Sequence, residues 1–316
     1  MVQTAADKAT REVLGPTLAR LAREGLDIVC VDADLGYSTS AVKFGHEFPD
    51  RFFPVGVAEQ NMIGVAAGLA SCGKVAFCSS FAVFAPGHCF DQLRMAVAQP
   101  RTNVKLFASH AGVVTGEDGA SAEALEDLTL MLSMPTFTVL FPADAVECEQ
   151  MIEVAARTDG PFYIRSMRPK IPILFDDSYR FELGKWPLMR DGKDVTLIAC
   201  GELVKAALDA AETLAGQGVD ARVLNASSLR PFDLEALLAA ARETGAIVTA
   251  EDHFIQGGLG GLVSQALAAE QPTPVEFVGM EGYGTSGTWK QLLQHFDLTP
   301  EAIARAAGNV ISRKSR

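Results

Sequence analysis

The stretch Phe52–Phe84, FFPVGVAEQNMIGVAAGLASCGKVAFCSSFAVF, contains the pattern that decides the fold. Within it, Glu59–Ser71 has the composition of a helix, and Lys74–Ser79 is a short apolar run typical of a buried strand. One carboxylate, Glu59, stands among residues that otherwise look buried. Because an unpaired buried carboxylate is costly, we expect Glu59 either to have a partner or to hold its proton.

The same alternation of short apolar runs and longer helical patterns continues on both sides of this stretch. The expected strands are Asp27–Asp32, Lys74–Ser79, Val104–Ser109, Thr136–Phe141 and Phe162–Arg165. The expected helices are Lys8–Glu24, Glu59–Ser71, Phe90–Ala98, Ala122–Met134 and Ala145–Thr158. Strand–helix alternation predicts a parallel sheet with helices on both faces.

The composition changes after Arg168, where the chain carries several prolines and scattered charges without a clear period up to Lys193. The alternation then resumes at Asp194–Cys200, Leu203–Ala215, Asp220–Ala226, Leu234–Glu243, Ala246–Glu251, Leu259–Ala269 and Pro274–Val278, with a helix at Pro300–Ala307. We therefore predict an α/β protein of two doubly wound domains: a parallel-sheet domain over residues 1–168, a linker over 169–193, and a smaller α/β domain over 194–316.

Composition excludes several classes of function. The chain of 316 residues has 48% hydrophobic and 21% charged residues, a globular balance that suits two domains. The net charge of -12 argues against a nucleic-acid surface, which needs a basic stripe. The beginning, MVQTAADKATREVL, has no apolar signal core, and no run approaches the roughly 20 apolar residues of a membrane span. We expect a cytoplasmic protein that does not bind membranes.

Cysteine and histidine usage points away from disulfides and metal sites. There are six cysteines and no CxxC pair, so we expect free, buried thiols in a reducing compartment. No set of histidines and cysteines has metal-ligand spacing, so no metal ligands are predicted in this chain. The cysteines are Cys30, Cys72, Cys78, Cys89, Cys148 and Cys200.

Glu59 has two possible roles. Small residues at helical spacing follow it, at Gly64, Gly68 and Ser71, and such a face lets another helix approach closely. A carboxylate at a helix start is stabilised by the helix dipole, so Glu59 could simply cap free amides. Alternatively, the carboxylate is directed at a cofactor nitrogen.

The segment Ser109–Leu128, SHAGVVTGEDGASAEALEDL, lies between an expected strand and an expected helix. Loops at the carboxyl ends of parallel strands are where α/β sheets bind ligands. Its glycines allow tight turns, and a histidine and two acids among them favour a polar substrate over a plain surface turn. A second glycine-rich segment, Glu251–Gly261, lacks the third glycine of a dinucleotide loop and reads as a simple strand-to-helix turn.

Four segments together resemble the second half of the transketolase family, and they occur in that family's order. They are VAEQNMIGVAAGLA, FCSSFAVFAPGHCFDQLRMA, SHAGVVTGEDGASAEALEDL and IVTAEDHFIQGGLG. The resemblance extends from about Ala9 to Ala307. It implies a pyrimidine-binding domain followed by a transketolase C-terminal domain.

The resemblance also implies roles for individual residues. Glu59 matches the glutamate that hydrogen-bonds the pyrimidine N1′ of thiamine diphosphate. Phe84 matches the ring that stacks on the pyrimidine, with Phe81 beside it. His110 and Asp118 match residues that face the substrate, and His110 is expected to act in catalysis with Glu59.

A further group of matching residues would hold the sugar phosphate: Arg11, Ser38 and Arg168. One position departs from the pattern, because Ala122 stands where many relatives have Gln or His. Alanine cannot bond a sugar hydroxyl, so the preferred ketose is not defined by this loop.

The family binds the cofactor's diphosphate and Mg²⁺ through a G-D-G segment and a distant Asn, and no G-D-G occurs in this sequence. The resemblance therefore implies a split enzyme, in which a separate N-terminal subunit with the G-D-G…N motif binds the diphosphate and Mg²⁺. Two copies of each chain would form a heterotetramer. The expected activity is two-carbon ketol transfer from a ketose phosphate to an aldose.

Two other readings remain. The chain could be the β-type subunit of a 2-oxoacid dehydrogenase or a deoxyxylulose-phosphate-synthase-like enzyme, since these share the domain pair and the glutamate. It could also be a non-catalytic partner protein. Retention of Glu59, Phe84, His110 and Asp118 together argues against the non-catalytic reading.

Overall fold

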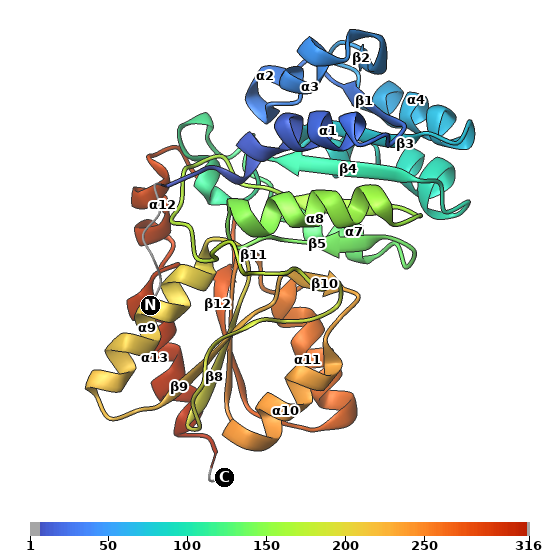
Figure 1. Cartoon of the computed structure of the whole chain (residues 1–316). Helices are drawn as coiled ribbons and strands as arrows, with labels where there is room; N and C mark the ends of the chain where they lie inside the picture. Colours follow the sequence, from blue (N-terminus) through green and yellow to red (C-terminus); the bar gives the residue numbers. More distant parts are fainter. Residues whose placement is uncertain (1–6, 315–316) are drawn as a thin grey trace.

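The computed structural model describes residues 7–314 and contains two sheets, one above the other in Figure 1. The first six residues of the N-terminal stretch analysed above, and the last two residues of the chain, lie outside the described residues. The first sheet has seven strands in the order β10-β5-β6-β4-β3-β1-β2, and the second has five in the order β12-β11-β8-β9-β7. Both are mostly parallel, and each carries one antiparallel edge strand, which confirms the predicted α/β class with two sheets.

The strands of the first sheet are β1 (Ile28–Asp32), β2 (Phe52–Pro54), β3 (Val75–Phe81), β4 (Val104–Ser109), β5 (Thr138–Leu140), β6 (Phe162–Arg165) and β10 (Ser228–Arg230). Its helices and helical turns are η1 (Thr10–Val13), α1 (Leu14–Arg23), α2 (Gly36–Thr39), α3 (Val42–Glu47), η2 (Pro49–Arg51), α4 (Glu59–Ser71), α5 (Ala85–His88), α6 (Phe90–Gln92), η3 (Leu93–Ala98), η4 (Val113–Asp118), α7 (Asp127–Leu132) and α8 (Ala145–Arg157).

The strands of the second sheet are β7 (Leu188–Arg190), β8 (Val195–Ala199), β9 (Ala221–Asn225), β11 (Ile247–Phe254) and β12 (Val275–Met280). Its helices are α9 (Leu203–Gly216), α10 (Leu234–Thr244), α11 (Leu259–Glu270), α12 (Trp289–His295) and α13 (Pro300–Ile311).

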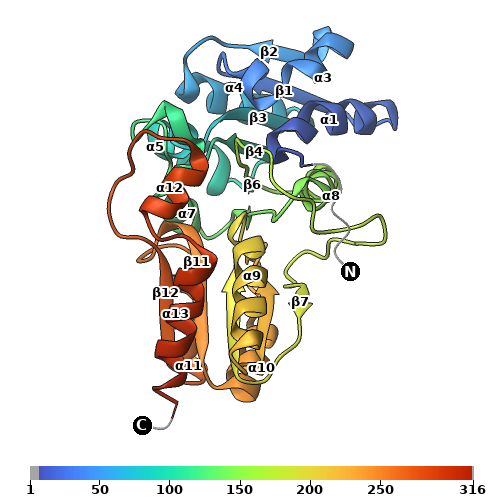
Figure 2. The ribbon, with the colours of Figure 1, turned by 90° about the vertical axis from the view of Figure 1, so that its left-hand side faces the viewer.

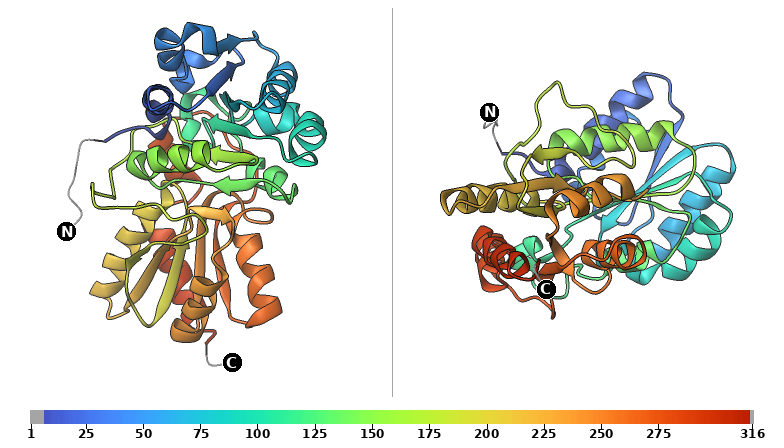
Figure 3. Two further views of the ribbon diagram at one scale, coloured as in Figure 1. Left: turned by 45° about the vertical axis from the view of Figure 1, so that its right-hand side comes forward. Right: turned by 90° about the horizontal axis from the view of Figure 1, so that it is seen from below.

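Both faces of the first sheet are covered by helices, which explains why its central strands are apolar throughout. Successive side chains of a strand point to opposite faces. Ile28 and Cys30 of β1 accordingly pack in the core formed with α1 and α8, whereas Val29 and Val31 pack in the core formed with α4. Figure 3 shows α1 and α8 together on one side of this sheet.

The second sheet follows the same rule. Leu197 and Val248 share a core with α9 and α13, and Ile198 and Ile247 share a core with α10 and α11. In Figure 2, α12 rises from this domain and reaches the first one. The second domain therefore places α12 next to the carboxyl ends of the strands in the first sheet.

Three local features differ from the sequence-based expectation. The segment expected to be a linker contains β7, which pairs antiparallel with β9. Strand β10, from the second half of the chain, joins the first sheet antiparallel to β5. The helix expected from Ala122 begins only at Asp127, because the backbone around Ala124 is held by a bridge to Ala111.

The structure also tests the cysteine prediction and the membrane prediction. All six thiols are free, and five are buried, but Cys72 is exposed because it follows the last residue of α4. The expectation of burial was therefore wrong for Cys72. Within residues 7–314, no helix has the length and apolar character needed to cross a membrane.

Candidate functional site

Glu59 is the first residue of α4, and its side chain is buried, with 8% of the residue exposed. Its Oε2 atom lies 3.4 Å from Nδ1 of His88, at the end of α5. Sequence reasoning missed His88, because nothing in the local pattern relates it to a residue 29 positions earlier. The side chain of His88 is more than half exposed, whereas that of Glu59 is only 10% exposed.

Four aromatic rings run in a row from His88 towards β4. Phe84 stacks on His88 at a centroid distance of 5.4 Å and on Phe81 at 5.8 Å. Phe81 in turn stacks on His110 at 3.7 Å. Phe81 and His110 are buried at the carboxyl ends of neighbouring strands, whereas Phe84 is only half-buried and offers a flat apolar surface. The row links the region of Glu59 to His110.

The imidazole of His110 is held in place by its neighbours. Ser109 Oγ lies 2.8 Å from Nδ1, and the hydroxyl of Thr115 donates to the backbone carbonyl of His110 at 2.7 Å. Burial, together with the positive charges of Arg11 and Arg168, lowers the pKa of His110 to about 3. His110 is therefore a neutral hydrogen-bonding group at physiological pH.

Arg11, Ser38 and Arg168, which are far apart in the sequence, come together beside His110. Arg11 donates from Nε to the carbonyl of Arg168 at 3.0 Å and from Nη1 to the carbonyl of Ser38. Arg168 donates to the carbonyl of Thr115 at 2.7 Å and pairs with the exposed carboxylate of Glu117. Ser38 contributes through its backbone here, whereas the resemblance pointed to the residue as a phosphate ligand.

A cavity of about 430 Å³ opens over the two arginines. Lys170 lies on its wall, and α12 of the second domain contributes Trp289 and Lys290. Sequence reasoning missed these three residues, because none of them lies in a recognisable motif. Trp289 and Lys290 also belong to the other domain. Two guanidinium groups and two ammonium groups around one cavity suit an anionic group, although acidic side chains also line the wall.

The remaining predicted residues lie on the loop formed by residues 110–122, called the 110–122 loop below. Asp118 is exposed at the end of η4. Ala122 is buried, and its amide donates to the carbonyl of Gly119 at 2.9 Å in a tight turn. The aromatic row thus connects Glu59 to His110. Arg168 connects the group of Arg11, Ser38 and Arg168 to the 110–122 loop, and Asp118 lies on the exposed side of that loop.

These residues fit the pyrimidine end of thiamine diphosphate. A buried carboxylate can accept from a ring N–H, and the half-buried ring of Phe84 can stack on a flat heterocycle. Among residues 7–314, no group of three or more His, Cys, Asp or Glu side chains could hold a metal ion.

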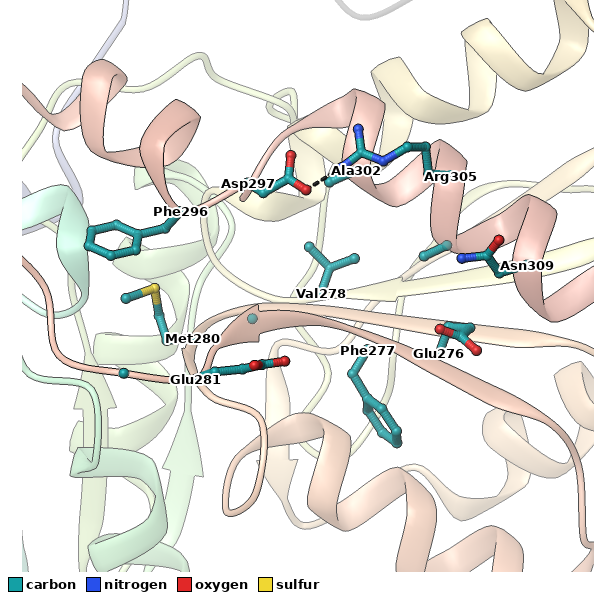
Figure 4. Close-up of a pocket in the computed structure, with 13 residues that line it drawn as sticks. Glu276, Phe277, Val278, Met280, Glu281, Phe296, Asp297, Ala302, Arg305 and Asn309 are labelled. Carbon is teal, nitrogen blue, oxygen red and sulfur yellow. Dashed lines mark hydrogen bonds and ion pairs between the residues drawn. The ribbon is translucent and has the colours of Figure 1, made fainter.

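A separate cavity of about 410 Å³ lies in the second domain, between β12 and α13 (Figure 4). Its polar side chains include Glu276, Asp297 and Arg305, and Arg305 pairs with Asp297. No predicted site residue lines it. We therefore do not include this cavity in the candidate site.

Comparisons with known proteins identify the family of the chain. The family described as transketolase, pyrimidine binding domain, matches residues 6–173, and the family described as transketolase, C-terminal domain, matches residues 184–303. The chain therefore belongs to the transketolase family, as its pyrimidine-binding and C-terminal domains.

Individual relatives make the comparison more specific. A putative transketolase C-terminal section from Methanocaldococcus jannaschii is 40% identical, over 94% of this chain and 95% of its own length. A 6-deoxy-6-sulfo-D-fructose transketolase subunit from Clostridium sp. (strain MSTE9) is also 40% identical, over 96% and 95%. The solved structure of a split gene transketolase, an inactive beta4 tetramer, superimposes with a TM-score of 0.90 at 42% identity, covering 98% of this chain and all of that one.

Proposed function

We propose that this chain is the C-terminal subunit of a split, thiamine-diphosphate-dependent transketolase that acts in the cytoplasm. It would transfer a two-carbon ketol unit from a ketose phosphate to an aldose. The observation that carries the proposal is the placement of Glu59, which is buried at the start of α4 and linked by the row of Phe84 and Phe81 to His110, in a chain of this family.

In this proposal the protein positions the reactants. The bound cofactor supplies the nucleophilic carbon. Glu59 accepts a hydrogen bond from the pyrimidine, Phe84 stacks on the ring, and the apolar surroundings strengthen the carboxylate's interaction. His110 bonds a substrate oxygen through Nε2, since Ser109 engages Nδ1. Asp118, at the rim, bonds a substrate hydroxyl.

Arg11 and Arg168 bind the anionic end of the sugar. Forked guanidinium groups suit phosphate by bidentate hydrogen bonding. The relative that is named for a 6-sulfo sugar indicates that a sulfonate is a second candidate for this end. Ser38 orients Arg11 through its backbone carbonyl.

The diphosphate and Mg²⁺ would be bound by an N-terminal partner subunit with the G-D-G…N motif, in a heterotetramer of two copies of each chain. The relatives described as a C-terminal section and as a split gene product support this division. So does the surface just before Glu59 in the chain, where Val57 is 79% exposed. Gly64 and Gly68 of α4 face open space nearby, so the backbone of this helix is accessible to another helix.

The test is reconstitution with a partner of similar length that carries G-D-G and a downstream Asn. Calorimetry of this chain alone, with and without Mg²⁺, should show no tight binding of thiamine diphosphate. The mixture should bind the cofactor and transfer ketol units between sugar phosphates. Micromolar binding by this chain alone would contradict the shared site, and an inactive mixture that still binds cofactor would contradict the assigned reaction.

A further inference from the structure

The carboxylate of Asp252 connects the second domain to the 110–122 loop. Asp252 is completely buried on β11, where its Oδ1 accepts from the amide of Val113 at 3.0 Å and its Oδ2 accepts from the amide of Val114 at 3.2 Å. The fit is close, because a Cβ added to Gly112 would lie 1.9 Å from Oδ2 of Asp252. Gly112 also has a φ of +76°, which favours glycine.

The same strand also holds the segment that follows the loop. The amide of Phe254 donates to the carbonyl of Leu125 at 3.0 Å. Arg165 bridges the two domains through Nη2, which donates to the carbonyls of Ala124 at 3.0 Å and Asp252 at 2.9 Å. The loop at Val113 and Val114 and the segment that follows it are therefore fixed to β11 or to a side chain that contacts it.

Arg165 and the two loop amides favour the ionised form of Asp252, whereas burial opposes it. Arg165 pairs with Asp127 at 2.8 Å and also attracts the carboxylate of Asp252. Burial raises the pKa values of both Asp252 and Glu202, and the charge of Asp252 raises that of Glu202 further. Arg165 and the two loop amides oppose the rise for Asp252, and both carboxylate oxygens accept amide hydrogen bonds, as those of an ionised carboxylate do. Hydrogen bonds from Val113 and Val114 are then charge-assisted, which makes them stronger than neutral ones.

The loop needs such external contacts, because its own sequence does not determine one conformation. His110, Gly116 and Gly119 all have φ values between +58° and +82°. Glycine visits these and other regions with similar ease, so glycine-rich loops gain their order from outside bonds.

We propose that Asp252 is a positioning residue that acts from the second domain: its carboxylate fixes the loop that carries His110 and Asp118. The effect on activity rests on the proposed function, whereas the effect on the loop does not. This gives the second domain a direct part in shaping the site, although Asp252 itself touches no reactant.

The first experiment compares Asp252→Asn with Glu202→Gln in the full chain by amide hydrogen exchange. In Asp252→Asn, an NH2 group replaces one of the two acceptor oxygens and faces a backbone N–H, so one of the two hydrogen bonds to the loop is lost. Amide exchange in the peptide covering residues 111–116 should therefore rise about 10-fold or more. Glu202→Gln mimics the protonated, neutral form of Glu202 in the same buried cluster and should leave that peptide unchanged. Peptides from β4 and β8 report on global unfolding.

Gly112→Ala tests the same contact from the loop side without changing any charge. Its added methyl group should displace the loop from Asp252 and raise exchange in the same peptide, and it decides the question if Asp252→Asn does not fold. In the reconstituted complex, Asp252→Asn should lower kcat/KM by about 10- to 100-fold and Glu202→Gln by less than about 3-fold.

Unchanged exchange at residues 111–116 in both Asp252→Asn and Gly112→Ala would overturn the proposal. Equal effects of Asp252→Asn and Glu202→Gln on exchange and activity would overturn it as well, because they would indicate a purely structural cluster. If the wild-type complex lacks transketolase activity, the proposed function fails, but the exchange comparison still decides whether Asp252 fixes the loop.

Discussion

Nδ1 of His88 lies 3.4 Å from Oε2 of Glu59, and the two residues belong to helices on either side of β3 in the chain. His88 is thus the partner that the protein itself provides for Glu59, the isolated carboxylate in the apolar stretch Phe52–Phe84. The contact is long for a hydrogen bond, and His88 is largely exposed. A ligand nitrogen can therefore approach Glu59 without breaking a strong internal bond.

Glu59→Gln should fold normally but lose most activity in the reconstituted complex. The amide can still bond the pyrimidine, but it lacks the negative charge, and losing one such electrostatic contact costs on the order of 10²–10³ in rate. Turnover with saturating cofactor is the measurement, and Glu212→Gln on the exposed face of α9 is the control. Near wild-type turnover would reduce Glu59 to a residue that only stabilises the helix start.

Arg168→Ala should raise KM for phosphorylated donors by about 10-fold or more, which corresponds to one charged hydrogen bond of roughly 1.5–3 kcal/mol. The same variant should change KM for unphosphorylated sugars much less. Arg157→Ala, on the outer surface of α8, serves as the control for loss of a surface charge. Equal changes for both classes of sugar would contradict a phosphate site at Arg168.

Ala122→Gln or Ala122→His should shift donor preference towards ordinary pentulose and hexulose phosphates. One neutral hydrogen bond contributes about 0.5–1.5 kcal/mol, so the shift should not exceed about 10-fold. The kcat/KM values for a panel of ketose phosphates measure it, and Ser121→Gln at the neighbouring exposed position is the matched control. If the order of donors stays the same, Ala122 only packs, and another residue sets specificity.

Glu123→Gln should stabilise the chain at pH 8 and have no effect at low pH. Both carboxylate oxygens of Glu123 are buried without a hydrogen-bond partner in the described structure, beneath Gly284. Burial raises the pKa of Glu123 to about 7, and the charge of Asp252 contributes to the rise. The folded state thus keeps a proton that the unfolded state loses, and the wild type loses stability as pH rises from the ordinary carboxyl value through about 7.

Glutamine cannot ionise, so the difference in melting temperature between Glu123→Gln and the wild type should be near zero below pH 4.5 and largest above pH 7. We expect a gain on the order of 2 °C at pH 8. Scanning calorimetry across this pH range is the measurement, with Glu212→Gln as the exposed control. A constant difference at every pH would show that packing, and not ionisation, causes the change.

Much of the fold could be predicted because it follows from local patterns. Apolar runs such as Val104–Ser109 are buried on both faces, and the sequence shows this directly. Helix α4 begins at Glu59 and ends at Ser71, as its composition predicted. The candidate site residues Glu59, Phe84, His110 and Asp118 lie within the quoted family motifs, and each motif is a continuous segment.

The sequence by itself thus determined the α/β class, the two-sheet organisation and the family. Only the tertiary structure decided that β10 crosses into the first sheet, that His88 meets Glu59, and that Asp252 holds the 110–122 loop. These contacts join residues 29 to 139 positions apart, or strands from different domains. A periodic pattern reports which face of its own element is buried. It carries no information about which distant side chain meets that face, because long-range pairing is selected by the packing of the whole chain.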